Sequence, residues 1–144
     1  SKIQVEKYSI KYGYNLESIK ISELKYIDKN QILRYFKPYK NKSIFLIPIN
    51  QISKEIIQNK WIKNIQIKSD YKTLLKVNIV EETPFGIYDN NNQKILFSSD
   101  LVILEIVQDY DEVTLSLLEN GYLWIYSSLH IWLTHAKETQ YAHS

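Results

Sequence analysis

Apolar and polar residues alternate over most of residues 64–81, on either side of a short polar break. The apolar positions carry branched aliphatic side chains and fall on every second residue: Ile65, Ile67, Leu75, Val77 and Ile79. A period of two places the apolar side chains on one face of a strand and the polar side chains on the other. The pattern predicts an antiparallel hairpin with one buried face and one exposed face.

Two shorter patterns precede this hairpin at the start of the chain. Residues 16–24 alternate around Ile19 and Ile21, which predicts a first strand. Residues 3–14 alternate more loosely, and we expect them to form a lead-in strand or an extended arm.

Two helices are predicted between the first strand and the hairpin. Asp28 is a suitable N-cap, Gln31 follows three residues later, and Pro38 ends the first helix. Pro48 suits the first turn of the second helix, which runs toward Trp61. The apolar residues of the two helices recur at helical spacing: Ile32, Leu33, Phe36, Ile49, Ile52, Ile56 and Ile57.

A second, β-rich region is predicted from Pro84 onward. Residues 85–88 and 94–97 are expected to be strands joined by an Asn-rich turn, and residues 101–107 form a nearly continuous apolar run. Residues 115–118 are a further apolar run. For residues 123–133 periodicity does not distinguish strands from a helix.

The composition excludes several classes of function. The 144 residues carry a net charge of +2, with lysines interspersed among acidic residues, and they include no cysteine. This charge balance gives no basic surface for nucleic acid. The absence of cysteine excludes disulfides, thiolate metal sites and a cysteine nucleophile. No apolar run approaches the roughly 20 residues that a membrane-spanning helix needs.

No pattern of residues predicts an active site, a cofactor site or a metal site. Glu81 and Glu82 are adjacent carboxylates, but neighbours in a strand point to opposite faces and cannot converge on a substrate. His130 and His135 show no zinc-type spacing. Trp61 is expected in the core rather than as an exposed anchor. We therefore expect a non-enzymatic protein without a cofactor, with a small hydrolase as the alternative from a different class.

The candidate partner-binding residues are Asn64, Gln66 and Lys68, on the polar side of the first hairpin strand. An edge strand offers unpaired N–H and C=O groups to which another chain can add a strand. The alternative is a solvated edge that its lysine protects from pairing. If residues 64–68 are the paired edge, we expect Gln66→Pro to weaken partner recruitment, because proline lacks the N–H donor.

The order of these segments resembles the POTRA domain of the bacterial division proteins FtsQ and DivIB over residues 14–97. Members of that family have a strand and a helix, a Ser-Ile-Phe type segment, a second helix ending in Trp-Ile-Lys, and a hairpin closing on Val-x-Glu-x-x-Pro. The matching segments are Ile19 to Ser22, Ile32 to Phe36, Ser43 to Phe45, Trp61 to Lys63 and Ile79 to Pro84. Lys60 departs from the family, where proline commonly precedes the tryptophan, and the β-domain is shorter than usual.

The resemblance implies an α+β fold, in which a POTRA-like β-α-α-β-β domain is followed by a partial β-rich domain. Together with the patterns above, it predicts a lead-in segment at residues 1–15, the POTRA-like domain at 16–83, the start of the β-rich domain at 84–133 and a polar tail at 134–144.

The resemblance also implies a non-enzymatic scaffold of the divisome. The implied location is the division septum, on the extracytoplasmic (periplasmic) side of the bacterial inner membrane, with a membrane anchor that precedes Ser1. The implied partners are other divisome proteins of the FtsB and FtsL type, and also of the FtsK type. The alternative is a POTRA module of an outer-membrane assembly or secretion factor, which binds client chains by strand addition.

Overall fold

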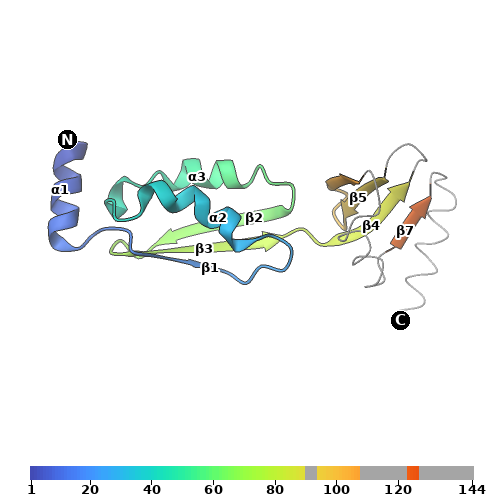
Figure 1. Ribbon diagram of the computed structural model, residues 1–144, viewed down its shortest axis with the longest axis horizontal. Helices are drawn as coiled ribbons and strands as arrows, with labels where there is room; N and C mark the ends of the chain where they lie inside the picture. Colours follow the sequence, from blue (N-terminus) through green and yellow to red (C-terminus); the bar gives the residue numbers. More distant parts are fainter. Residues whose placement is uncertain (90–93, 108–122, 127–144) are drawn as a thin grey trace. The chain divides into compact units, whose positions relative to one another are not determined.

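The computed structural model describes residues 1–89, 94–107 and 123–126 of the chain (Figure 1). The chain divides into two compact units, Ser1–Glu81 and Glu82–Ser144. Residues 115–118, the predicted turn at residues 90–92, the polar tail and all three histidines lie outside the described residues.

The first unit contains a three-stranded sheet covered on one face by two helices (Figure 1). The strand order is β1-β3-β2, in which the central strand β3 pairs parallel with β1 and antiparallel with β2. The predicted β-α-α-β-β order and the α+β class are confirmed. In chain order the elements are β1 (Ser18–Ile21), α2 (Lys29–Phe36), α3 (Ile49–Ile56), β2 (Ile62–Ser69) and β3 (Leu74–Glu81).

The alternation in β2 and β3 works as the sequence predicts. Leu75 and Val77 of β3 are completely buried beneath the helices, while Lys76 and Asn78 between them are exposed. Residues of β2 and β3 pair in a continuous register from Asn64 to Ser69, after a bulge near the start of β2. Because side chains alternate along a strand, this register aligns Ile65, Ile67, Leu75, Val77 and Ile79 on the helix side.

Helix α2 begins and ends where the sequence indicates, whereas α3 begins as predicted but ends at Ile56, short of Trp61, which the prediction placed near its end. The side chain of Asp28 accepts a hydrogen bond from the N–H of Asn30 at 2.9 Å, which caps α2. Pro38 lies in the short 3-10 helix η1 (Lys37–Tyr39) that follows α2 directly. Pro48 immediately precedes α3. The buried stripes consist of Ile32 and Phe36 on α2 and Ile52 and Ile56 on α3.

The expectation of a strand or extended arm over residues 3–14 is wrong, because residues Lys2–Tyr12 form helix α1. Ser1 caps its N-terminus, and Gly13 ends it with a left-handed backbone, φ 76°. Glycine adopts this conformation without steric cost. Alternation around Ile3 and Val5 suggested a strand, yet both side chains are exposed on the helix.

Helix α1 is held against η2 (Ile44–Leu46) by buried hydroxyl groups. The Oγ atoms of Ser9 and Ser43 lie 2.6 Å apart, and both residues are buried. The backbone N–H of Ser43 also donates to the Glu6 carboxylate at 3.1 Å. These contacts join segments that are 34 residues apart in the chain, so local patterning could not predict them.

The carboxylate of Glu81 fixes the loop between β1 and α2. Its Oε2 accepts from the N–H of Lys25 at 2.7 Å, and its Oε1 accepts from the N–H groups of Tyr26 and Ile27, both at 2.8 Å. Three backbone donors outside any helix or strand are thereby satisfied by one side chain. This gives a structural role to the glutamate of the Val-x-Glu-x-x-Pro pattern.

The second unit contains a four-stranded sheet with the order β6-β5-β4-β7. Strands β4, β5 and β6 form antiparallel pairs between chain neighbours, whereas β7 pairs parallel with β4. Within the ambiguous residues 123–133, the described part is a strand. The strands are β4 (Pro84–Asp89), β5 (Lys94–Ser98), β6 (Ile103–Val107) and β7 (Leu123–Tyr126).

Replacement of Glu81 by glutamine should lower the free energy of unfolding of the first unit by about 1–3 kcal/mol, because the amide NH₂ would face a backbone donor. Native-state hydrogen exchange of the Val77 amide measures this change in the whole chain. The same substitution at exposed Glu23 is the control and should stay within about 0.5 kcal/mol of wild type. Equal stabilities of the two variants would contradict the role of Glu81.

Candidate protein-interaction site

Strand β2 is an edge strand of the first sheet, since among the described residues it pairs on one side only, with β3. The side chains of Asn64, Gln66 and Lys68 are exposed and, by alternation along the strand, lie on the face of the sheet opposite the helices. The structure therefore brings the three predicted residues together along one strand. Whether a partner binds them stays a prediction.

The hairpin hydrogen bonds indicate which backbone groups of β2 face β3. The N–H of Asp70 donates to the carbonyl of Leu74 at 3.0 Å. In an antiparallel pair, the residues whose backbone N–H and C=O groups are directed inward, toward the partner strand, recur at every second position. The register places the inward-directed groups of β2 at Lys68, Gln66 and Asn64.

The opposite side of β3 gives the same result independently. The N–H of Ser22 donates to the carbonyl of Val77 at 2.9 Å, so the backbone of Val77 is directed toward β1 and that of its neighbours toward β2. The backbone groups of Ile65 and Ile67 are consequently directed to the open edge. Sequence reasoning missed this division of roles, because it requires the register.

This geometry changes how the edge must be tested. A proline at Gln66 would remove an N–H directed at β3, and it would damage the hairpin itself. The residues that offer backbone donors and acceptors to a partner are Ile65 and Ile67, whereas Asn64, Gln66 and Lys68 offer their side chains.

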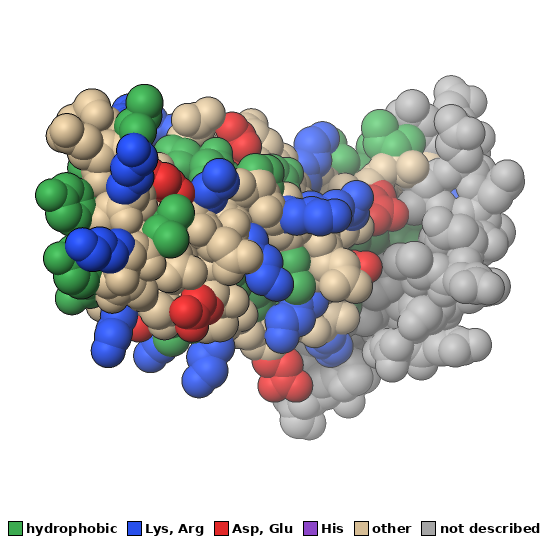
Figure 2. Space-filling view, turned by 60° about the vertical axis from the view of Figure 1, so that its left-hand side comes forward, with side chains coloured by type: hydrophobic (Ala, Val, Ile, Leu, Met, Phe, Trp, Pro, Cys, Tyr) green, Lys and Arg blue, Asp and Glu red, His purple; other side chains and the backbone are tan. Residues whose placement is uncertain are grey.

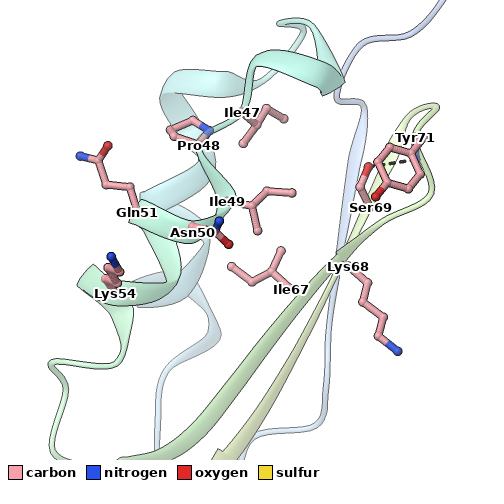
Figure 3. Close-up of a pocket in the computed structure, with 10 residues that line it drawn as sticks. All are labelled: Ile47, Pro48, Ile49, Asn50, Gln51, Lys54, Ile67, Lys68, Ser69 and Tyr71. Atoms are coloured by element: carbon pink, nitrogen blue, oxygen red, sulfur yellow. Dashed lines mark hydrogen bonds between the residues drawn. The ribbon is translucent and has the colours of Figure 1, made fainter.

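A groove lies between the N-terminal part of α3 and the end of β2, beside the open edge (Figure 3). Its volume is 940 Å³. The apolar side chains of Ile47, Ile49 and Ile67 converge on this groove in Figure 3, while Lys68 points away from α3. The lining also includes the polar residues Asn50, Gln51 and Lys54. An extended chain added to β2 would therefore find apolar contacts in this groove for the side chains of one of its faces, beside polar ones.

The hairpin tip that borders the groove is held by Asp70. Its Oδ1 accepts from the N–H groups of Lys72, Thr73 and Leu74 at 2.8, 2.9 and 2.9 Å. These bonds, led by the bond from Leu74, lower the pKa of the Asp70 carboxyl below its usual value of 3.8. Tyr71 adopts a left-handed backbone, φ 58°, and its ring is exposed.

A second exposed surface lies around α1, which the sequence analysis did not predict as a helix. The rings of Tyr8 and Tyr12 are stacked with centroids 6.2 Å apart, and Tyr14 contacts Phe45. All four rings are exposed. Figure 2 shows hydrophobic side chains interspersed with lysines on the surface of the first unit. This surface carries no group that points to a particular ligand.

The remaining candidates from the sequence have structural positions. Trp61 is half-buried, packs against the core of the first unit and contacts the ring of Tyr26 at 5.3 Å between centroids. Both carboxylate oxygens of Glu81 are engaged by loop N–H groups. Glu82 is buried, and its Oε2 has no hydrogen-bond partner among the described residues. None of the helices in the described ranges has the length and apolar content needed to cross a membrane.

Comparison with known proteins agrees with this architecture. Residues 14–82 match the model of the FtsQ-type POTRA domain. The chain is 28% identical over 90 residues to a cell division protein FtsQ of Rickettsia typhi, an alignment that covers 62% of this chain and 34% of that protein. A cell division protein FtsQ of Rickettsia bellii is 24% identical over 99 residues, covering 69% and 37%. The alignments thus span about one third of the length of these relatives.

The strand order, the helices on one face and the matched range define the first unit as a POTRA domain. The type of that domain and the relatives show that the chain is similar to the FtsQ/DivIB cell division proteins over this part of its length. The resemblance noted in the sequence is confirmed.

The lowered pKa of Asp70 predicts a pH dependence of hairpin stability. The contribution of the Asp70 carboxylate to the free energy of unfolding is complete above the unfolded pKa, near 3.8. It is lost as the pH falls through the lower pKa of the folded state. Wild type should therefore be more stable than Asp70→Asn near neutral pH, and the difference should disappear in strong acid. Urea unfolding of both proteins across this range measures it. A difference that is independent of pH would contradict the electrostatic explanation.

Proposed function

We propose that this chain acts as a non-enzymatic scaffold of the bacterial divisome and binds other division proteins through its POTRA domain. The FtsQ-type POTRA domain and the similarity to FtsQ cell division proteins support the role in division. The open edge of β2 supports the mode of binding, since it is a one-sided strand bordered by a groove that contains apolar side chains. The edge is the observation that carries the proposal.

Strand addition is the mechanism that this edge favours. A partner segment in extended conformation would pair with the outward-directed backbone of Ile65 and Ile67. Each new ladder hydrogen bond contributes a net 0.5–1.5 kcal/mol, roughly, so a short segment reaches useful affinity only when side chains contribute as well. Asn64, Gln66 and Lys68 would lie beside the side chains of the partner and set specificity.

The proposed partners are division proteins of the FtsB and FtsL type, with the FtsK type as a further one. The proposed location is the periplasmic side of the inner membrane at the septum, where a membrane anchor would hold the protein. Confinement of both proteins to one membrane raises the effective concentration of the partner, so strand pairing of low affinity would be enough to form the complex.

Replacement of Ile65 by proline should lower partner recovery about tenfold or more, since a ladder bond is lost and the ring obstructs the incoming strand. The matched control is Ile65→Ala, which truncates the same side chain and keeps the N–H. Co-purification of FtsB-type and FtsL-type proteins with the full-length tagged protein from its host measures the effect. Equal recovery from both variants, each folded by circular dichroism, would exclude this edge.

The cellular role is tested by the position of the tagged full-length protein during constriction. A mid-cell band that requires residues 16–82 is expected for a divisome scaffold. Uniform envelope staining, with loss of outer-membrane proteins on depletion, would overturn the proposal in favour of an outer-membrane assembly factor.

A further inference from the structure

We infer that the strand received by β2 is acidic on one face and apolar on the other. An aspartate or glutamate lies beside Lys68, and its two chain neighbours place branched apolar side chains in the groove between α3 and β2. This inference rests on the proposed strand addition, and it specifies the chemistry of the segment that binds.

Three lysines lie side by side across the open face of the sheet. Lys20 of β1 is in register with Lys76 of β3, and Lys76 is in register with Lys68 of β2. All three side chains are exposed. Adjacent strands lie about 4.8 Å apart, so the row presents like charges at regular short intervals. Its two ends lie on the edge strands, Lys20 on β1 and Lys68 on β2, and the groove lies beside β2.

A row of like charges in register is unfavourable unless an opposite charge joins it. The other paired positions on this face of the three strands carry no acidic side chain, and exposed Lys63 at the bulge of β2 is a further cation. These paired positions are Ser18, Leu74, Asn78, Val80, Asn64 and Gln66. Asp70 follows at the hairpin tip, but its Oδ1 already accepts three backbone hydrogen bonds. The fourth position of the row belongs to the incoming strand, and a carboxylate there offsets the repulsion.

The geometry of the edge brings that carboxylate close to Lys68. Outward hydrogen bonds come from Ile65 and Ile67, so Lys68 occupies a non-hydrogen-bonded position toward an antiparallel partner. Opposite residues at such positions have Cα atoms about 4.5 Å apart, closer than at hydrogen-bonded positions. An antiparallel segment therefore places its acidic side chain directly against the lysine.

The apolar half of the specificity comes from the opposite face of the same strand. Residues adjacent to the acidic one point toward α3, because side chains alternate. There the groove presents Ile47, Ile49 and Ile67, which all converge on it (Figure 3). The segment is thus apolar, acidic, apolar over three successive residues.

Synthetic peptides in which valine and threonine alternate provide the test, with one central threonine replaced by glutamate, glutamine or lysine. Fluorescence anisotropy with the whole chain measures their affinities. The glutamate peptide should bind about fivefold more tightly than the lysine peptide at low salt, with glutamine between them. A scrambled glutamate peptide keeps the charge, loses the alternation and should bind more weakly.

Charge reversal identifies the lysine. Lys68→Glu should remove the preference for glutamate and favour the lysine peptide, whereas Lys29→Glu, on α2, makes the same change in net charge and should leave the order unchanged. Equal affinity of the glutamate, glutamine and lysine peptides would overturn the inference. Binding of the scrambled peptide as tightly as the alternating glutamate peptide would also overturn it. So would the absence of binding by the glutamate peptide.

Hydrogen exchange separates this inference from the proposed strand addition. Peptide binding should slow exchange at the outward-directed amides of Ile65 and Ile67 more than at Gln66. Slowed exchange without a charge preference would leave strand addition in place and overturn the acidic specificity. A charge preference without slowed exchange would place the peptide elsewhere and overturn both.

Discussion

The first unit depends on the burial of strand β3. Leu75 and Val77 are completely buried, and β3 is the only strand in the described part of this sheet that pairs on both sides. Burying a branched aliphatic side chain contributes about 1.5–3 kcal/mol, so these positions stabilise the contact of the sheet with both helices. Because the helices cover one face, the other face and the β2 edge stay accessible. The candidate site is a consequence of this one-sided packing.

The parts of the fold that the sequence predicted are those in which local pattern and tertiary packing agree. The period of two in β2 and β3, the Asp28 cap and the prolines flanking the helices all describe interactions within a few residues. In helix α1 the local pattern and the packing disagree, because Ile3 and Val5 follow the alternation of a strand while Ser9 is the buried residue of the helix. Ser1 and Gly13 were usable capping signals, but the hydrogen bond that docks the helix reaches Ser43.

For the candidate site, the sequence predicted only which side chains of β2 are exposed. Asn64, Gln66 and Lys68 follow from alternation alone. The outward direction of the Ile65 and Ile67 backbone follows from the register, which the hairpin hydrogen bond of Asp70 reveals. The groove and the lysine row join residues far apart in the chain, as do β4 and β7 of the second unit, which pair in parallel. The topology of the chain determines such contacts, and the hydrophobic periodicity of the sequence does not reveal the topology.

The lysine row also bears on why an open edge does not recruit a second copy of the same chain. Edge-to-edge pairing of two β2 strands about a two-fold axis perpendicular to the sheets would place both lysine rows on one face. Lysines on edge strands oppose such self-pairing, because their charges repel and their long side chains resist desolvation. An acidic segment would instead be attracted to the lysine at the same position. The row that would attract a partner would therefore also disfavour self-association, so one feature distinguishes the two occupants of the edge.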